Sequence, residues 1–362
     1  MYETFPSMRT VAVLAALGAC AFSAWAEASF TFGGYGTLGA VRASTDEVQF
    51  RSSPRQHKGA DRSVDLGVDS RLGLQATLHV DEAFSAVGQV LTSRRDGREG
   101  PQLEWLYVQS TPMQGLDLRA GRLVLPIFMV SDTRNVGYAI HWLRAPNEVY
   151  GPYAHTSFDG AQLLWRSSDG PVNLGVQASA GTSEAPLFLA VRTDLKYRRL
   201  YSVAVTAERN AWTLRASRTL GKGATFSGTP VPSGDDTFTD IGAQYDDGRF
   251  IAVGEYIWRS YSAMGLLDHA AFYVSAGLRL GSLTPYATYA RFMPEGLSFG
   301  VNAPDGTTRA VGLRWDVARN VALKAQIEAT RHSKYAFVDP TPGFTARQPS
   351  VRAMSVAMDF VF

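Results

Sequence analysis

The chain has 362 residues, of which 45% are hydrophobic, and a formal net charge of +2. A nearly neutral chain lacks the concentrated basic charge of a nucleic-acid-binding protein. Beyond the N-terminus no run of eighteen apolar residues occurs, which excludes membrane-spanning helices. A membrane barrel is not excluded, because alternating strands keep hydropathy near average.

The N-terminus has the pattern of a secretory signal peptide. A basic residue, Arg9, precedes an apolar run at 11–24, and the small-residue cleavage pattern A-x-A stands at 24–26. We therefore predict that residues 1–26 are a signal peptide and that the mature chain covers 27–362.

Cys20 is the single cysteine of the chain and lies inside this predicted signal peptide. The mature chain then has no cysteine, which excludes disulfides and cysteine-bound metals. A lipoprotein signal ending at Cys20 is the alternative, and the A-x-A site that follows argues against it. Translation starts at Met1 or at Met8, since residues 1–7 add nothing to the pattern.

From Phe30 onward the sequence has the period of two that predicts half-buried strands. In the first segment Phe30, Phe32 and Leu38 share one face, while Thr31 and Thr37 share the other. Segments of ten to twelve residues match the length that crosses a bilayer at a tilt. We predict about sixteen strands, near 30–40, 70–80, 84–94, 102–111, 116–126, 158–168, 171–181, 199–209, 212–220, 238–246, 249–260, 270–281, 284–293, 307–317, 320–332 and 351–361.

The connections between these predicted strands alternate between short turns and long loops. Such alternation is typical of an antiparallel up-and-down transmembrane β-barrel with short periplasmic turns and long outer loops. The long connections are predicted at 44–68, 95–101, 127–157, 182–198, 221–237, 261–269, 294–306 and 333–350. The longest, 127–157, does not alternate and is rich in charged and aromatic residues, as functional loops often are.

Alternation alone does not separate a soluble sandwich from a membrane barrel, because both have one apolar and one polar face. Strand length, loop alternation and aromatic residues near the strand ends favour the barrel, with apolar side chains toward lipid and polar ones toward a wet lumen. The fold is therefore expected to be all-β.

The last segment, at 352–362, reads RAMSVAMDFVF and places Phe360 and Phe362 on the face of three alternate apolar residues. It resembles the C-terminal recognition strand of Gram-negative outer-membrane proteins. We therefore expect Phe360 and Phe362 to act as an assembly signal.

The whole mature chain resembles the Gram-negative porins, which are sixteen-stranded trimeric diffusion channels of the outer membrane. The resemblance rests on FGGYGTLGA, SRLGLQATL, QLEWLYVQ, LRAGRLVLP and the terminal DFVF. It implies a homotrimer in the cell outer membrane, in contact with lipid, lipopolysaccharide and the barrel-assembly machinery. It also implies that the third outer loop, here 127–157, folds into the lumen and narrows the pore. The acidic PEFGGD-like sequence of the enterobacterial loop is absent, so only the position and role of the loop are carried over.

A porin selects solutes by size and by the field of charged residues at its constriction. The loop candidates are Asp132, Arg134, His141, Arg144 and Glu148. The wall candidates, which have lumen parity, are Arg71, Glu104, Asp117, Arg119, Arg215, Arg279, Arg314 and Lys324. The competing interpretation of each is that it only solvates the lumen or pairs with a neighbour.

Other chemistry is weakly indicated. The six histidines show no HxH or HExxH spacing and no GxSxG sequence occurs, so no metal, cofactor or enzymatic activity is expected. We predict passive diffusion of ions and small hydrophilic solutes, with a weak preference for anions. The alternatives are a substrate-specific channel with a binding site at the loop, an outer-membrane enzyme, and a plugged structural or adhesive barrel.

Overall fold

A computed structural model describes most of the chain beyond the predicted signal peptide. The described residues are 28–167, 169–188, 192–227, 229–230, 235–261, 268–295, 297–298, 301–302, 305–333, 335–338 and 350–362. The predicted signal peptide at 1–26 therefore lies outside them. Within these ranges, no helix has the length and apolar character needed to cross a membrane.

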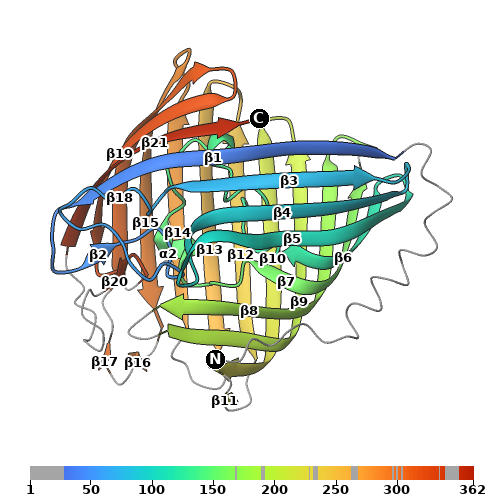
Figure 1. Ribbon diagram of the computed structural model, residues 1–362, viewed down its shortest axis with the longest axis horizontal. Coiled ribbons are helices and arrows are strands. Elements are labelled where there is room, and N and C mark those ends of the chain that lie inside the picture. The colour runs from blue at the N-terminus through green and yellow to red at the C-terminus, as the bar shows by residue number, and fades with distance from the viewer. Residues whose placement is uncertain are drawn as a thin grey trace.

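The fold is one antiparallel sheet that closes on itself. Its sixteen long strands are β1 (Ser29–Ala43), β3 (Arg71–His79), β4 (Phe84–Arg95), β5 (Arg98–Met113), β6 (Leu116–Val124), β7 (Ser157–Ser167), β8 (Asn173–Phe188), β9 (Arg192–Arg209), β10 (Trp212–Phe226), β12 (Asp236–Asp246), β13 (Phe250–Tyr261), β14 (His269–Leu278), β15 (Leu283–Pro294), β18 (Gly306–Ala318), β19 (Val321–Arg331) and β21 (Ser350–Val361). Strand β1 pairs with β3 along 29–37 and with β21 along 35–43, which closes the barrel. Figure 1 shows β1 lying between β21 and β3.

Five two-residue strands lie at the loop end of this barrel. They are β2 (Gln49–Phe50), β11 (Thr229–Pro230), β16 (Leu297–Ser298), β17 (Val301–Asn302) and β20 (Phe337–Val338). The pair β2–β20 joins the first connection to the last one, over a small apolar cluster that includes Val48, Phe50 and Phe337.

The two faces of the sheet have the polarity of a membrane barrel. On β21, Met354 and Val356 are 58% and 56% exposed, whereas Ser355 and Asp359 are 4% and 1% exposed. The same inversion recurs on β19, where Ile327 is 51% exposed and its neighbours are buried polar residues. Period-two alternation thus places apolar side chains outside and polar side chains inside. The sixteen predicted strands and the all-β barrel are confirmed.

Two connections differ from their predicted length. The second loop is only Asp96 and Gly97, with φ of 56° and 74°, values that suit a tight hairpin turn. The fourth is also short, since β8 extends to Phe188 and β9 begins at Arg192. The long connections predicted at 95–101 and 182–198 are therefore wrong, because strand pairing continues beyond the bilayer-crossing length.

A β-bulge on β5 changes which side chains face the lumen. Gln89 pairs with Trp105 and Val90 with Leu103, so Glu104 is an extra residue in the ladder. Trp105 and Tyr107 consequently share the inner face with Gln89 and not the outer face with Leu103, where strict alternation puts them.

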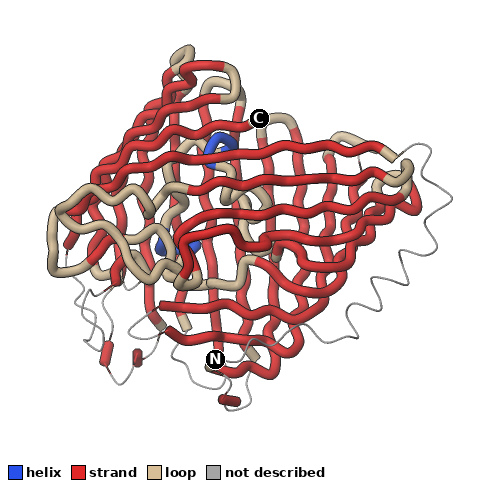
Figure 2. Tube along the Cα trace, in the orientation of Figure 1, coloured by secondary structure: helices blue, strands red, loops and turns tan. Residues whose placement is uncertain are grey.

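The connection between β6 and β7, residues 125–156, folds into the barrel, as predicted for 127–157. It contains the short helices η1 (Gly137–Ala139) and α2 (Asn147–Tyr150). Figure 2 shows both short helices surrounded by the strands of the barrel. The largest apolar cluster of the described chain lies between this segment, hereafter the lumen loop, and the inner faces of β9, β12, β13, β14 and β15.

Candidate functional site

Cations on the barrel wall hold the lumen loop by its backbone. Lys324 Nζ donates hydrogen bonds to the carbonyl oxygens of Gly137, Ile140 and Trp142 at 2.7, 2.8 and 2.9 Å. Arg314 donates to the carbonyl oxygens of Tyr138 and Ile140 at 2.7 and 2.9 Å. An irregular segment needs such donors, because its carbonyl groups have no strand partner. Two predicted wall cations therefore lie beneath the loop.

Lys324 is fully buried and its ammonium group has a carboxylate partner as well. Its Nζ atom lies 2.9 Å from Oδ2 of Asp359, whose side chain is 1% exposed. Thr37 of β1 donates a hydrogen bond to the other oxygen of this carboxylate at 2.6 Å. The loop is thus fixed to the seam where β1 and β21 close the barrel.

Aromatic packing holds the middle of the loop against β14 and β15. His141 lies edge-on to Trp142 and Tyr286, with ring centroids 4.5 and 5.8 Å away. Its Nε2 atom is 2.9 Å from Oγ of Ser275. Burial, with Lys324 and Arg279 nearby, lowers the pKa of His141 to about 3. The imidazole is therefore neutral at physiological pH and adds no charge to the lumen.

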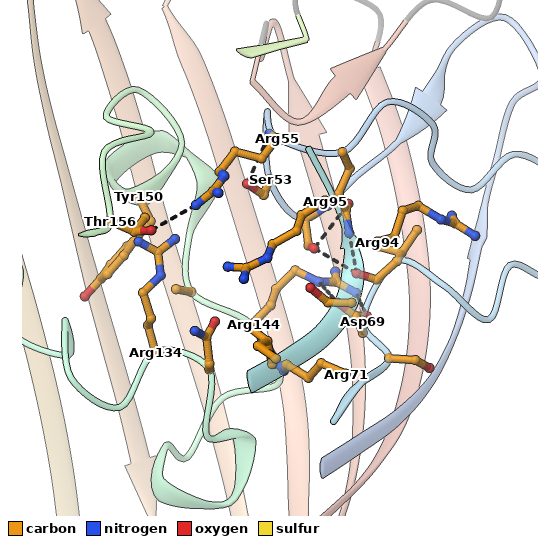
Figure 3. Close-up of a pocket in the computed structure, with 18 of the residues that line it drawn as sticks. Ser53, Arg55, Asp69, Arg71, Arg94, Arg95, Arg134, Arg144, Tyr150 and Thr156 are labelled. Atoms are coloured by element: carbon orange, nitrogen blue, oxygen red, sulfur yellow. Dashed lines mark hydrogen bonds and ion pairs between the residues drawn. The ribbon is translucent and has the colours of Figure 1, made fainter. Parts of the chain in front are cut away.

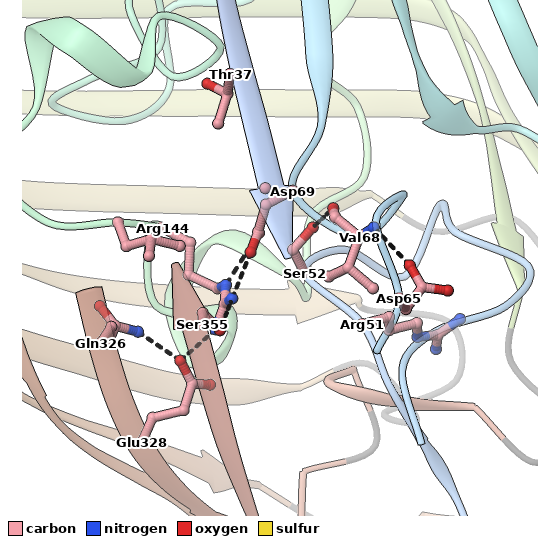
Figure 4. A network of polar contacts seen from close by, with 12 residues as sticks. Thr37, Arg51, Ser52, Asp65, Val68, Asp69, Arg144, Gln326, Glu328 and Ser355 are labelled. Atoms are coloured by element: carbon pink, nitrogen blue, oxygen red, sulfur yellow. Dashed lines mark hydrogen bonds and ion pairs between the residues drawn. The ribbon is translucent and has the colours of Figure 1, made fainter. Parts of the chain in front are cut away.

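Arg144 links the lumen loop to the first loop and to the barrel wall (Figure 4). It binds both carboxylate oxygens of Asp69, with Nη2–Oδ2 at 2.5 Å and Nε–Oδ1 at 3.1 Å. It also forms an ion pair with Glu328 and donates to Oγ of Ser355 at 2.6 Å. Burial lowers the pKa of Arg144, but Asp69 and Glu328 outweigh it and the net shift is upward. Arg144 is thus a compensated, permanently charged anchor.

Glu148 belongs to α2 and is almost fully buried behind the loop. Its Oε1 atom accepts a hydrogen bond of 2.7 Å from Thr308, and its Oε2 atom has no hydrogen-bond partner in the described chain. Burial raises the pKa of Glu148 from 4.5 to about 7. Its charge at neutral pH therefore depends on whether the loop is docked.

Between the lumen loop, the first loop and strands β3 to β5 lies a polar cavity of ≈ 110 Å³. Side chains from all of these elements surround it (Figure 3). Its charged lining residues are Arg55, Arg71, Arg94, Arg95, Arg134 and Arg144, with Asp69 and Glu104. Because six arginines and only two acids line this cavity, we call it the arginine cavity.

Most of these arginines have acidic partners. Arg55 pairs with Asp96 at 2.5 Å and Arg94 pairs with Asp65 at 2.8 Å. Arg95 pairs with Glu104 on the bulge of β5. Four of the six cations, counting Arg144, are therefore compensated locally.

Arg71 and Arg134 form no ion pair with any described residue. Arg71 only approaches Oγ1 of Thr37, at 3.4 Å. Burial, with Arg55 nearby, lowers the pKa of Arg134 to about 10, so the guanidinium stays charged at neutral pH. These two are therefore the arginines of the cavity lining that have no carboxylate partner of their own in the described chain.

The other predicted site residues lie away from this cavity. Arg119 stacks 5.2 Å from the ring of Tyr107, and Arg215 donates to the carbonyl oxygen of Pro126 at 3.0 Å. Arg279 pairs at 2.5 Å with Asp246, where β12 meets its turn. At the same end Asp117 accepts from Arg166 at 2.6 Å, and Asp132 is exposed on the lumen loop.

Sequence reasoning missed Arg55, Asp69, Arg94 and Arg95. The doublet Arg94-Arg95 stands immediately before Asp96-Gly97, a dipeptide that signals a hairpin turn. Recognising that turn would have placed the doublet at the end of a strand and close to Glu104. No sequence pattern points to Arg55 or Asp69. Both lie in the connection between β1 and β3, and only the fold of that connection brings them to the site.

Phe360 and Phe362 lie at the closure seam, with stacked rings 6.3 Å apart. Their rings lie against Gly36 and Gly34 of β1, where any Cβ atom would overlap with them. The glycine-rich first strand thus accommodates the C-terminal aromatic residues.

The chain was compared with known proteins. The model of the Gram-negative porin family matches residues 10–335. No curated protein matches the chain. Among solved structures it is similar to an anion-selective porin from Comamonas acidovorans, with a TM-score of 0.61, 14% identity, and 93% and 100% of the two chains covered.

Two further structures have the same fold. One is OmpF of Salmonella typhi in complex with daunomycin, with a TM-score of 0.60, 12% identity and coverage of 92% and 97%. The other is the trimer form of OmpT, an outer-membrane protein of Vibrio cholerae, with a TM-score of 0.55, 14% identity and coverage of 92% and 99%.

A closed sixteen-stranded barrel with a polar inner face and an apolar outer face is the architecture of an outer-membrane channel. The chain belongs to the Gram-negative porin family. It resides in the outer membrane and provides a water-filled path for passive diffusion of ions and small hydrophilic solutes. Its family and fold are those of a channel rather than of an enzyme.

Proposed function

We propose that this porin conducts anions in preference to cations, and that the arginine cavity is its selectivity region. The observation that carries the proposal is the pair of uncompensated cations, Arg71 on β3 and Arg134 on the lumen loop, beside one cavity. The remaining loop and wall candidates then act mainly by fixing the loop or by solvating the lumen.

The physical basis is the field of unpaired charge in a narrow polar passage. Low-dielectric walls focus such a field, raise the local concentration of counter-ions and repel ions of like sign. Arg71 and Arg134 face the cavity without neutralising carboxylates, whereas Arg144 is held by Asp69 and Glu328. The two free guanidinium groups therefore dominate the field that a passing ion experiences.

Replacing both free cations tests this proposal. We expect the double variant Arg71→Gln/Arg134→Gln to lose most of the anion preference, measured as the reversal potential in a salt gradient across a planar bilayer. Arg279→Gln is the control for each single variant, Arg71→Gln or Arg134→Gln, since it removes one lumen-parity arginine at the turn end, and it should leave the reversal potential near that of the wild type. A cation preference in the wild type would refute the proposal.

A substrate-specific channel is the second candidate. The small volume of the arginine cavity, ≈ 110 Å³, and its many hydrogen-bond donors favour it. A specific channel should be blocked by micromolar concentrations of one solute class and not by others. If all small anions permeate equally and without saturation, the substrate-specific channel is excluded and the general diffusion channel remains.

We also infer the assembly and export of the chain. Residues 1–26 would direct export, and Phe360 and Phe362 would be recognised by the barrel-assembly machinery. A homotrimer in contact with lipid and lipopolysaccharide is expected, in line with the trimer form of the Vibrio protein. Chemical cross-linking of the detergent-solubilised protein tests the trimer; a single monomeric band would contradict it.

A further inference from the structure

The arginine cavity is lined by hydrogen-bond donors that the described chain does not match with acceptors. Arg134 forms no hydrogen bond or ion pair with any described residue, and Arg71 has only its long contact of 3.4 Å with Thr37. Each guanidinium group carries five N–H donors and no acceptor. Arg95 adds its Nε atom, which is buried without a hydrogen-bond partner in the described chain. These donors fit a ligand that supplies acceptor oxygens.

The two carboxylates of the cavity lining are fully engaged by protein donors. Arg144 binds both oxygens of Asp69, at 2.5 and 3.1 Å. One oxygen of Glu104 accepts a hydrogen bond of 3.1 Å from Asn135, and the other pairs with Arg95. A cation that entered the cavity would therefore meet no free carboxylate oxygen on its lining, whereas an anion would meet free guanidinium groups.

Other arginines that face the lumen without an ion pair are not in this situation. Arg119 donates to the side-chain oxygen of Gln109 at 2.8 Å. Arg215 donates to Thr206 at 2.9 Å and to the carbonyl oxygen of Pro126 at 3.0 Å. Both guanidinium groups thus have close acceptors within the described chain, which Arg71 and Arg134 lack.

Positive charges are crowded at Arg134. Burial lowers the pKa of this residue to about 10, and the positive charges of Arg55 and Arg71 lower it further than burial alone would. Figure 3 shows Arg55 and Arg134 reaching into the same part of the cavity, where Arg55 donates to Thr156 at 2.9 Å. Partly buried cations without a counter-charge cost free energy. An anion between them offsets that cost, and two unpaired guanidinium groups match a double negative charge.

The size of the cavity limits the ligand to a few heavy atoms. Its volume is ≈ 110 Å³, whereas pockets for drug-sized molecules enclose about 300–1,000 Å³. A small inorganic oxyanion fits such a space, and a sugar phosphate or a nucleotide does not.

We propose that the arginine cavity binds a small doubly charged oxyanion, of the sulfate or hydrogenphosphate kind, between Arg71 and Arg134. This inference rests on the anion preference proposed above and names the solute class for which the site is built. Guanidinium groups bind such oxyanions through pairs of parallel N–H···O hydrogen bonds, which a lysine ammonium group does not reproduce. A dianion held in this way occupies the cavity longer than chloride does, and it therefore reduces the chloride current while it is bound.

The test measures block of the single-channel chloride current of the full chain in planar bilayers. Sulfate and perchlorate are the matched probes, because both are tetrahedral anions with four oxygens and only sulfate carries two charges. We expect sulfate to block saturably, with a half-blocking concentration at least tenfold lower than that of perchlorate. Glycerol phosphate, a larger dianion, should block less than sulfate. Equal block by sulfate and perchlorate, or stronger block by glycerol phosphate, would overturn the proposal.

The variant Arg71→Lys/Arg134→Lys separates binding by guanidinium groups from the effect of charge alone. It should keep a reversal potential near that of the wild type but need about tenfold more sulfate for half-block. Arg71→Gln/Arg134→Gln should need about a hundredfold more, since a hydrogen bond to a charged group contributes about a factor of ten to a hundred. The matched control Arg119→Gln/Arg279→Gln removes two arginines that face the lumen outside the cavity, and it should be blocked like the wild type.

The outcomes distinguish this inference from the proposed function. An anion-selective wild type that sulfate does not block, or a lysine variant that is blocked as strongly as the wild type, would refute the dianion site and leave the anion preference standing. A cation-selective wild type would refute the anion preference itself. Equal weakening of block in the control variant would show that sulfate binds elsewhere in the lumen. A folded, heat-modifiable band on a gel confirms that each variant forms the barrel.

Discussion

Glu148 shows how burial couples the ionisation of one residue to the position of a loop. Its pKa is about 7 when the lumen loop is docked, compared with 4.5 in water, because burial disfavours the charged form. Because the pKa of Glu148 is higher in the docked state, its contribution to the stability of docking is fully present below about pH 4.5. This contribution is lost as the pH rises through about 7. The difference of 2.5 units corresponds to about 3 kcal/mol. His141 takes no part, since it stays neutral over this range.

This coupling predicts pH-dependent gating. Closing or noise events in single-channel recordings should become more frequent between pH 5 and pH 8, as the ionised Glu148 carboxylate weakens docking. Glu148→Gln keeps the hydrogen-bonding shape but cannot ionise, and should remove the pH dependence. Asp132→Asn is the control, because Asp132 is an exposed acid of the same loop. Identical pH dependence in wild type and Glu148→Gln would show that docking does not depend on this residue.

The lumen loop owes its conformation to the wall, and Lys324 is its main backbone anchor. Lys324→Met should lower the free energy of unfolding by about 3–5 kcal/mol, because it leaves the carboxylate of Asp359 buried without its cation. Heat or denaturant titration, followed by loss of the folded band on a gel, measures the effect. The double variant Lys324→Met/Asp359→Asn should recover part of the loss. Full stability of the single variant would mean that the loop carbonyl groups find other donors.

The strands could be predicted closely from the sequence, whereas the loop contacts could not. Period-two alternation is local, so the bounds of β19 or β21 are visible in the residues themselves. Strict alternation gives the wrong face for Tyr107, because the bulge on β5 has no marker in the sequence. The ends of β8 and β9 were predicted wrongly because strand pairing continues past the bilayer. The partners of Lys324 depend on a loop nearly two hundred residues away.

At the scale of the whole molecule, barrel closure separates an apolar outer face from a polar inner face. The inward arginines of the arginine cavity are the ones proposed to act on solutes. The lumen face could be assigned from the sequence by parity. Which inward arginines remain unpaired could not, because Asp65, Asp69 and Asp96 reach them through loops.

The most direct test of a channel narrowed by its lumen loop is single-channel conductance in planar bilayers, for the wild type and for a variant lacking residues 135–148. The deletion removes η1, the segment that follows it and the first two residues of α2, while leaving all sixteen strands intact. We expect discrete conductance steps from the wild type and distinctly larger steps from the deletion variant. Steps of equal size, or a wild type that does not conduct, would contradict a lumen loop that sets the width of an open pore.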